Sequence, residues 1–430
     1  MRRVSERELA DRLAALGARA ARSPRPQGEA HRSDDLPRAV VGGNFGTPRR
    51  LLELFDASVE RYRLFMINAQ PPVPERSGVV HETPFVGPGM RPSSPHAASR
   101  LDYLPMRLSL VPQLFERVRP PDVVLLHTAP AENGSVSLGI EVNILVAAVE
   151  QARARGGLVV AQLNPRMPRT LGDAELDVDL VDLAIEAEEE LVSPAPPAPG
   201  GGSRAIGEHV ASLVADGSTL QVGIGAIPDA TLGALAGRRG LGVWSEMVSD
   251  GVLALERAGA LDPERELVAS FLFGSAELYE WVDRNPRLRL VRTETSNDPG
   301  RIARRPRMTS VNTALQVDLF AQANAAYIGP RVYSGFGGQT DFIVGALHSP
   351  GGQAVIALGS WHEKTASSTV LARLESPSTS FQHSAIVTEQ GIAQIFGRSQ
   401  RAQARLIIEH AAHPDARAGL QEAAVELGLG

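Results

Sequence analysis

The sequence contains no cysteine. This absence excludes disulfide bonds, thiolate zinc sites, iron–sulfur clusters and a cysteine nucleophile. No apolar run reaches the roughly 18 residues that a membrane span requires, and the charged N-terminal stretch has no continuous apolar core of the signal-peptide kind. We therefore expect a cytoplasmic protein that does not bind membranes.

Lysine is almost absent as well. Lys364 is the only lysine in a chain rich in arginine, and the formal net charge is −6. A negative net charge argues against general binding to nucleic acid. Of the ten histidines, only His410 and His413 fall close together in the sequence, in a helical context that favours a surface face over a metal site. We expect no bound metal.

A run of proline and glycine from Ser193 to Ser203 divides the 430 residues into halves of similar size. Proline and glycine at this density cannot build a helix or a central strand, so the sequence predicts a linker or a long exposed loop there. It separates a predicted N-terminal domain, residues 1–195, from a predicted C-terminal domain, residues 203–430. A polar, proline-containing stretch, Ser23–Asp35, is predicted to be mobile.

Each half alternates short apolar runs with helical patterns. This order predicts an α/β fold in which helices cover largely parallel sheets. Because ligands bind in such folds beyond the carboxyl ends of the strands, a site is expected in the loops that follow strands. Strands are predicted at Asp122–His127, Gly157–Leu163, Thr219–Val222 and Leu241–Trp244, and helices at Glu141–Arg155 and Pro228–Ala236.

Three loops carry candidate residues. Gly223–Asp229 follows a strand and opens a helix, so its amides can hold an anion or oxyanion, although such a turn is more often only a tight connection. It lacks the third glycine of the dinucleotide fingerprint, which argues against a nicotinamide or flavin site.

Glu246 follows the next strand and should share that edge of the sheet, although a lone glutamate there is usually a solvated charge. Tyr333–Phe342 has three glycines in four positions and forms a second backbone cradle.

Several long segments together resemble the acetyl-CoA hydrolase/transferase family, in particular its 4-hydroxybutyrate CoA-transferase-like branch. The resemblance extends over about residues 37–424 and implies two open α/β/α domains of the NagB/RpiA/CoA-transferase type, with the active site in the cleft between them. The segments that carry it are Phe85–Pro88, Ala129–Gly139, Asn164–Thr170, Leu220–Leu232, Ser245–Gly251, Ser296–Pro299, Asn312–Asn324 and Ser334–Phe342.

The resemblance also implies roles for single residues. Glu246 matches the glutamate that forms a covalent glutamyl-CoA thioester, and Asn297 matches an asparagine close to that thioester. Ile224 and Gly338 match backbone donors to the oxyanion. Contacts with CoA are implied for Gly223, Ile224, Gly225, Ala226, Ile227, Ser334, Gly337 and Gly338, and for Lys364, which falls where relatives place a basic residue near the CoA phosphates.

The implied reaction is transfer of CoA from an acyl-CoA to a small carboxylic acid, with acetate or a short-chain or hydroxy acid as acceptor, by a ping-pong mechanism. CoA is then a substrate, and no cofactor is bound permanently. Ala129–Gly139 and Arg166–Thr170 are expected to shape the pocket for the acid. Relatives imply a homodimer or a larger homo-oligomer.

Two alternatives to transfer remain. The same residues could hydrolyse acyl-CoA, and only the dependence of the rate on an acceptor acid separates the two reactions. The chain could also be a non-catalytic protein that binds CoA or a sugar phosphate on the same fold. Retention of Glu246 beside both glycine loops argues against this last alternative, because a sensor has no use for the nucleophile.

Overall fold

The computed structural model describes residues 1–20, 36–193, 200–378 and 382–430. The predicted mobile stretch Ser23–Asp35 lies outside these residues, as does most of the predicted linker. The last residues of that linker are helical, because α6 begins at Gly201 and runs to Leu213. Within the described residues, no helix has both the length and the apolar character that crossing a bilayer requires.

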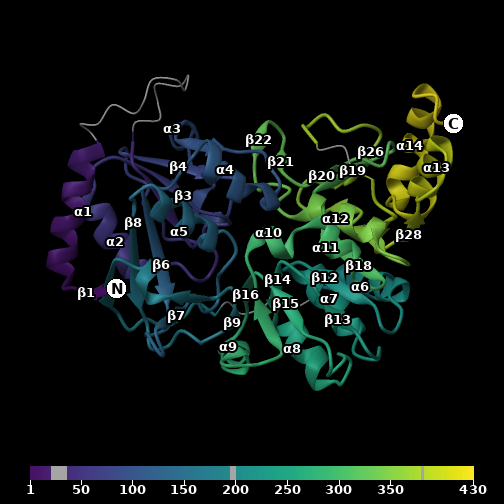
Figure 1. The fold of residues 1–430 in the computed structure, drawn as a ribbon. Coiled ribbons are helices and arrows are strands. Elements are labelled where there is room, and N and C mark those ends of the chain that lie inside the picture. The colour runs from purple at the N-terminus through teal and green to yellow at the C-terminus, as the bar shows by residue number, and fades with distance from the viewer. Residues whose placement is uncertain (21–35, 194–199, 379–381) are drawn as a thin grey trace.

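The first half of the chain is built around one sheet, drawn in purple and blue in Figure 1. Among the described residues this sheet has eight strands, and all neighbouring strands are parallel. This confirms the predicted parallel α/β architecture. The strand order is β1 (Arg2–Arg3), β11 (Leu183–Glu186), β8 (Leu158–Leu163), β6 (Val123–Thr128), β2 (Arg38–Val41), β3 (Tyr62–Phe65), β4 (Val79–Thr83) and β5 (Leu101–Tyr103).

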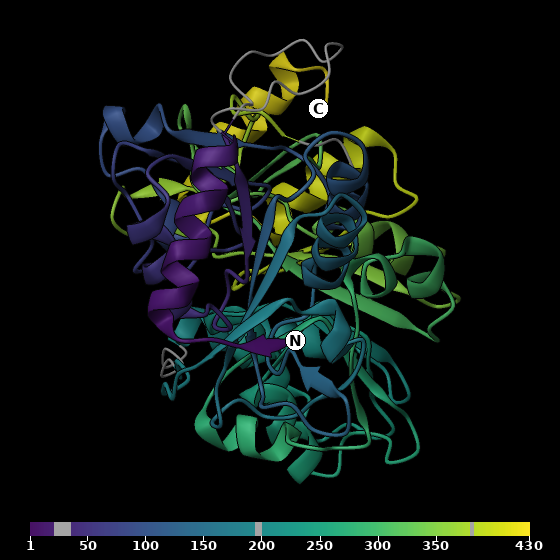
Figure 2. The same ribbon diagram turned by 60° about the vertical axis from the view of Figure 1, so that its left-hand side comes forward.

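Helices cover both faces of this sheet because its central strands are apolar on both sides. In β2, Ala39 and Val41 pack in the same core as α1 (Glu6–Ala20) and α2 (Arg49–Ser58). Val40, between them, packs in the core that contains α4 (Val111–Arg117) and α5 (Leu145–Ala154). The alternation follows the two-residue period of a strand. Figure 2 brings α1 forward, where it lies across the strands.

The second half is built around another sheet in which five of the six described strands are parallel. Only β28 runs antiparallel to its neighbour β27. Val355 packs with α6 on one face, while the next residue, Ile356, packs on the other face with the helices α11, α12 and α13. The strand order is β13 (Gly242–Val243), β12 (Thr219–Val222), β18 (Met308–Thr313), β23 (Gln353–Ala357), β27 (Ala385–Thr388) and β28 (Gly391–Gln394); the helices are α11 (Pro299–Ala303), α12 (Gln339–His348), α13 (Gln400–His410) and α14 (Pro414–Glu426).

Short strands join the two halves near the middle of the molecule (Figure 1). β9 (Leu171–Gly172), from the first half, pairs with β17 (Leu288–Leu290), from the second. β14 (Met247–Ser249) pairs with β16 (Phe271–Phe273), and Phe271 forms an isolated bridge with Glu141. One apolar core contains residues from both halves. The segment around Glu141 lies against β16, and β16 pairs with β14, the strand that follows Glu246.

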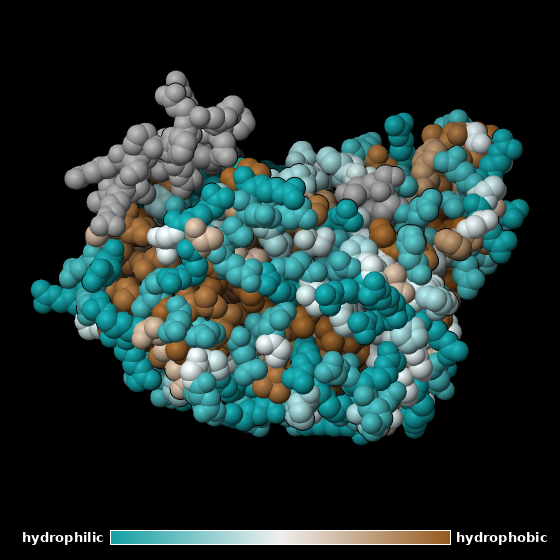
Figure 3. Space-filling model, viewed as in Figure 1, coloured by the Kyte–Doolittle hydropathy of each residue, from teal (hydrophilic) through white to brown (hydrophobic). Residues whose placement is uncertain are grey.

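The predicted elements are all present, with shifts at their ends. The expected helix Glu141–Arg155 begins only at Leu145, because the amides of Val142 and Asn143 donate to Ser270 O instead of continuing a helix. The expected helix Pro228–Ala236 is α7 (Ala226–Ala234), with its proline in the first turn. On the face shown in Figure 3 most of the surface is hydrophilic, and apolar areas show in recesses and on the C-terminal helices.

Candidate active site

The site lies in a cavity of about 270 Å³ that residues from both halves line, hereafter the central cavity. Several lining residues come just after parallel strands: Asn44 follows β2, Asn68 follows β3, and Gly223 and Ile224 follow β12. These are the carboxyl ends of the strands, where an α/β fold places its ligands. Glu246 also lines the cavity.

Glu246 is held between the short strands β13 and β14. Its carbonyl oxygen accepts hydrogen bonds from the amides of Ser270, at 2.8 Å, and Phe271, at 3.1 Å. β12 and β13 are parallel neighbours, with Leu220 opposite Val243. The glycine loop after β12 and the glutamate after β13 therefore share one edge of the sheet, which confirms the prediction from chain order.

Asn297 fixes the carboxylate of Glu246. It caps α10 (Thr293–Ser296), is fully buried, and donates from Nδ2 to Glu246 Oε2 at 2.9 Å. Its Oδ1 accepts from Ser296 Oγ at 2.7 Å, so the amide cannot turn over without losing both hydrogen bonds. One carboxylate oxygen is thereby held, and the other is not committed to Asn297. Figure 1 shows α10 near the centre of the molecule.

Gly338 meets the same carboxylate from another side. A Cβ added at this position would lie 2.0 Å from Glu246 Oε2 and 2.3 Å from Asn297 Nδ2. Its φ of −85° is ordinary for any residue, so the requirement for glycine here is steric. Gly338 precedes α12, and a side chain at this position would collide with the Glu246 carboxylate.

The environment of Glu246 disfavours the charged carboxylate. Burial raises its pKa to about 7, with a further rise from the negative charge of Asp341, while the hydrogen bond from Asn297 acts in the opposite direction. A carboxylate with few water contacts loses the hydration that makes an ordinary glutamate a poor nucleophile. The group is therefore poised between its two protonation states near neutral pH.

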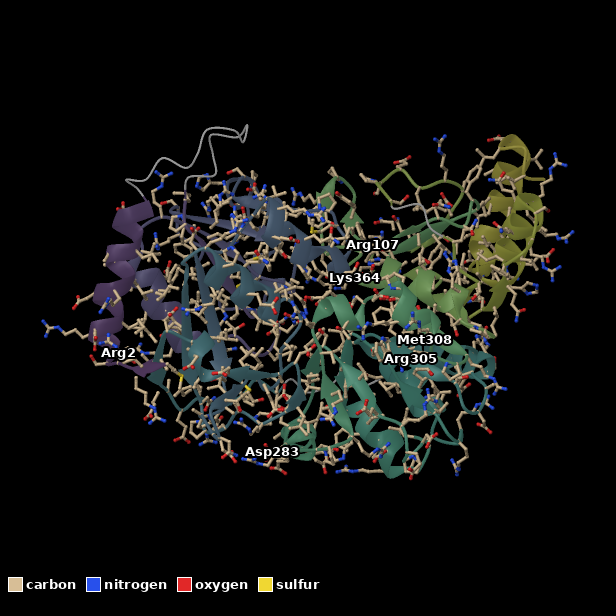
Figure 4. All side chains as sticks on the ribbon, in the orientation of Figure 1. Arg2, Arg107, Asp283, Arg305, Met308 and Lys364 are labelled. Atoms are coloured by element: carbon tan, nitrogen blue, oxygen red, sulfur yellow. The ribbon has the colours of Figure 1, made fainter. Side chains whose placement is uncertain are left out.

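Asp341 lies in the first turn of α12 and links the two halves. Ser109, from the first half, donates to it from Oγ at 2.7 Å and from its amide at 3.2 Å. Arg107 is 3.7 Å away and lies near the middle of the molecule (Figure 4). Burial raises the pKa of Asp341 to about 6, although the hydrogen bonds from Ser109 and the positive charge of Arg107 act to lower it. Asp341 also lies close enough to Glu246 for its negative charge to raise the pKa of that carboxylate.

The loop Ser334–Gly338 is a packed segment, as its flanking aromatic residues predicted. Ser334 O accepts from the amide of Val86, and Gly337 O from the amide of Leu108. Gly337 has a φ of +52°, and a Cβ there would come within 2.9 Å of the Phe85 ring. The loop is thus seated on the first half of the chain while it faces Glu246.

The structure brings together only part of the predicted set. Glu246, Gly223, Ile224, Ser334 and Gly338 line the central cavity, and Asn297 reaches it through Glu246. The remaining predicted contacts do not line the cavity. Four of them belong to the two glycine loops: Gly225, Ala226, Ile227 and Gly337. Lys364 is exposed in the turn between β24 (Trp361–His362) and β25 (Ser367–Ser368). Lys364 is labelled in Figure 4. Their roles toward CoA stay predictions.

The expectation about the acid pocket finds no support in the lining of the central cavity. The segments Ala129–Gly139 and Arg166–Thr170 do not line the central cavity. They pack on each other instead: Ser137 Oγ donates to Thr170 O, and Thr170 Oγ1 donates to Gly139 O. Three asparagines that the sequence analysis did not single out do line the cavity: Asn44, Asn68 and Asn143. The first two follow buried strands, and that position was the signal that could have identified them.

Comparison with protein families places these features in context. Residues 49–196 match the acetyl-CoA hydrolase/transferase N-terminal domain, and residues 274–424 match the acetyl-CoA hydrolase/transferase C-terminal domain. A curated relative, 4-hydroxybutyrate coenzyme A transferase of Clostridium kluyveri, is 39% identical over 352 residues, which are 79% of this chain and 80% of the relative. Succinyl-CoA:acetate/propanoyl-CoA:succinate CoA transferase of Fasciola hepatica is 33% identical over 91% of this chain and 85% of its own.

Solved structures are similar to this chain as well. RipA from Yersinia pestis superposes with a TM-score of 0.81 at 26% identity, over 92% of this chain and 94% of its own. A 4-hydroxybutyrate CoA-transferase from Porphyromonas gingivalis superposes with a TM-score of 0.75 at 28% identity, over 99% of this chain and 98% of its own. The similarity therefore extends over both sheets and over the junction where Glu246 lies.

Proposed function

This chain is a CoA-transferase of the acetyl-CoA hydrolase/transferase family, and we propose that it works through a covalent glutamyl-CoA thioester on Glu246. The observation that carries this proposal is the environment of that carboxylate. It is held by Asn297 at 2.9 Å, faces the backbone of Gly338, and opens into a cavity that both halves line. A carboxylate placed this way serves as a nucleophile rather than as a solvated surface charge.

The first half-reaction conserves the energy of the thioester. A carboxylate oxygen of Glu246 attacks the acyl carbonyl, the carbon–sulfur bond breaks, and CoA leaves as a thiolate, so that a mixed anhydride between the acyl group and Glu246 remains. The thiolate then attacks the glutamyl carbonyl, which forms the glutamyl-CoA thioester and releases the first acid as its carboxylate. The acceptor acid reverses these steps and leaves as the new acyl-CoA.

Each of these attacks passes through an oxyanion. We assign the backbone amides of Ile224 and Gly338 as its donors, because both residues line the cavity beside Glu246. One well-placed donor of this kind is commonly worth about 3 kcal/mol of transition-state stabilisation. Asn297 acts as a positioning residue, since it holds Oε2 and leaves the other oxygen for attack.

The acceptor is acetate or another short-chain or hydroxy acid. The central cavity, at about 270 Å³, must hold the acid and the reacting end of CoA together, which limits the acid to a small one. The CoA arm enters past Ser334, at the start of the glycine-rich loop.

The pH dependence of the rate should report the titration of Glu246. Because only the carboxylate attacks, kcat/KM for acyl-CoA is expected to rise with pH and to reach half its maximum near pH 7.

Asp341→Asn should lower this midpoint by about half a pH unit or more, because it removes a negative charge that raises the pKa of Glu246. Asp177→Asn, at an exposed helix cap in the first half, is the matched control and should leave the midpoint unchanged. A rate independent of pH from about 5.5 to 8.5 would contradict this assignment.

Steady-state kinetics test the proposed function. With acyl-CoA and acceptor acid both varied, a ping-pong transferase gives parallel lines in double-reciprocal plots, and release of free CoA without an acceptor is slow. Intersecting lines would show that both substrates must be bound at once, which contradicts the ping-pong mechanism. Rapid release of free CoA without any acceptor acid would mean that the enzyme is a hydrolase.

A further inference from the structure

A buried carboxylate that the mechanism does not use lies beside the central cavity. Glu141 is 2% exposed, and its Oε1 accepts from Gly43 N at 3.0 Å and from the Nδ2 groups of Asn44 and Asn143, each at 2.9 Å. Its Oε2 accepts from Asn44 N at 3.1 Å. Every one of these partners is a donor, which fits an ionised carboxylate that can only accept. Burial raises the pKa of Glu141, while these donors act against the rise.

The carboxylate fixes the orientation of two side-chain amides in series. Because Glu141 can only accept, Asn44 must turn its Nδ2 toward it, and its Oδ1 then faces Asn68. Asn68 must in turn present Nδ2 to that oxygen, and it does so at 2.8 Å. The carbonyl oxygen of Asn68 is left at the end of the series. Among the described residues, Asn68 Oδ1 has no hydrogen-bond donor, and the residue is half-buried and lines the central cavity.

The backbone of Asn68 is fixed as firmly as its side chain. Its φ of +52° lies in the left-handed region, which asparagine tolerates better than most residues. Its amide donates to Phe85 O at 2.9 Å, and its carbonyl accepts from Gln70 Nε2 at 2.7 Å. The residue that carries this acceptor oxygen is therefore held in place on the wall of the cavity that Glu246 also lines.

We propose that Asn68 is a specificity-determining residue whose Oδ1 accepts a hydrogen bond from a hydroxyl group on the acyl chain, so that the enzyme prefers hydroxylated short-chain acids. This inference rests on the proposed function, since it places the acyl chain between Glu246 and Asn68. A hydroxyl group can donate to this oxygen. An unsubstituted chain would exclude solvent from this oxygen and leave it unpaired, which costs binding energy.

The test compares a hydroxy acid and a plain acid of the same length as acceptors. The probes are butyrate, 3-hydroxybutyrate and 4-hydroxybutyrate, with acetyl-CoA as the donor. In the wild type, kcat/KM for the better hydroxybutyrate should exceed that for butyrate by about 5- to 10-fold. Asn68→Gly keeps the left-handed backbone and removes the oxygen, so this ratio should fall to about 1, because the hydroxyl group loses its acceptor and butyrate no longer leaves an oxygen unpaired.

Asn133 offers a matched control for this substitution. It has a φ of +49°, is exposed in a turn, and does not line the central cavity. Asn133→Gly should therefore leave the selectivity ratio at its wild-type value. A wild type without preference for either hydroxy acid, or a ratio that Asn68→Gly leaves unchanged, would overturn the inference while transfer itself continues. If none of the three acids accepts CoA although labelled acetate still exchanges into acetyl-CoA, the inference alone fails. If that exchange is absent as well, the proposed function fails with it.

Discussion

Glu246→Ala is expected to abolish CoA transfer, with kcat lowered by about 10⁴-fold or more, because it removes the group that we propose forms the covalent bond. The fold should persist, since the carboxylate makes one side-chain hydrogen bond, to Asn297, and lines a cavity rather than a core. Circular dichroism and thermal unfolding check the fold, and single-turnover assays check the chemistry. Activity within about 10-fold of the wild type would remove Glu246 from the mechanism.

A neutral isostere at the same position tests the electrostatic part of the account. The pKa of Glu246 in the folded protein, about 7, is above the ordinary 4.5, so the folded state binds this proton more tightly than the unfolded chain. The stability that the folded protein gains from binding this proton on Glu246 is therefore fully present below about pH 4.5 and is lost as pH rises to about 7. Glu246→Gln should raise the free energy of unfolding at pH 8 by about 1–3 kcal/mol and by clearly less at pH 5. An equal effect at both values of pH would contradict the raised pKa.

Gly338→Ala is expected to lower kcat/KM by about 10²- to 10³-fold without unfolding the protein. The added methyl carbon would lie 2.0 Å from Glu246 Oε2 and 2.3 Å from Asn297 Nδ2, so the nucleophile and its positioning amide must both move. The backbone angles of Gly338 suit alanine, and the damage is therefore confined to the site. The loss should appear mainly in kcat, because the geometry of attack changes more than the contacts with remote parts of CoA.

Gly419→Ala is the matched control for this substitution. Gly419 lies in α14, is exposed, and has no atom within 4 Å of an added Cβ. Alanine there should leave the activity unchanged and stabilise the helix by about 0.5–1 kcal/mol. If Gly338→Ala were as harmless to activity as this control, the close approach of the backbone to Glu246 would have no catalytic role.

The sequence was most informative where function depends on neighbouring parts of the chain. The loops after Thr219–Val222 and Leu241–Trp244 could be placed on one sheet edge, because consecutive parallel strands are usually neighbours. β12 and β13 do pair in this way. The packed character of Ser334–Gly338 was also predictable from its aromatic neighbours, and Phe85 provides that packing.

The opposite wall of the cavity could not be predicted, because its contacts join distant parts of the chain. Glu141 binds Asn44, which is 97 residues away, and the amides of Val142 and Asn143 bind Ser270. Nothing in the local sequence around Glu141 shows that its carboxylate is buried. Asp341 lay inside a recognised motif, but its position between Ser109 and Glu246 depends on how the two halves pack.

The most direct test of the covalent intermediate is the intact mass of the purified protein after brief mixing with acetyl-CoA, without an acceptor acid. The account predicts a mass increase equal to CoA less one water, located on Glu246 by peptide mapping and discharged by added acetate or butyrate. Glu246→Gln should not form this adduct. Absence of any adduct in the wild type, with steady release of free CoA, would contradict the account and place water at the centre of the reaction.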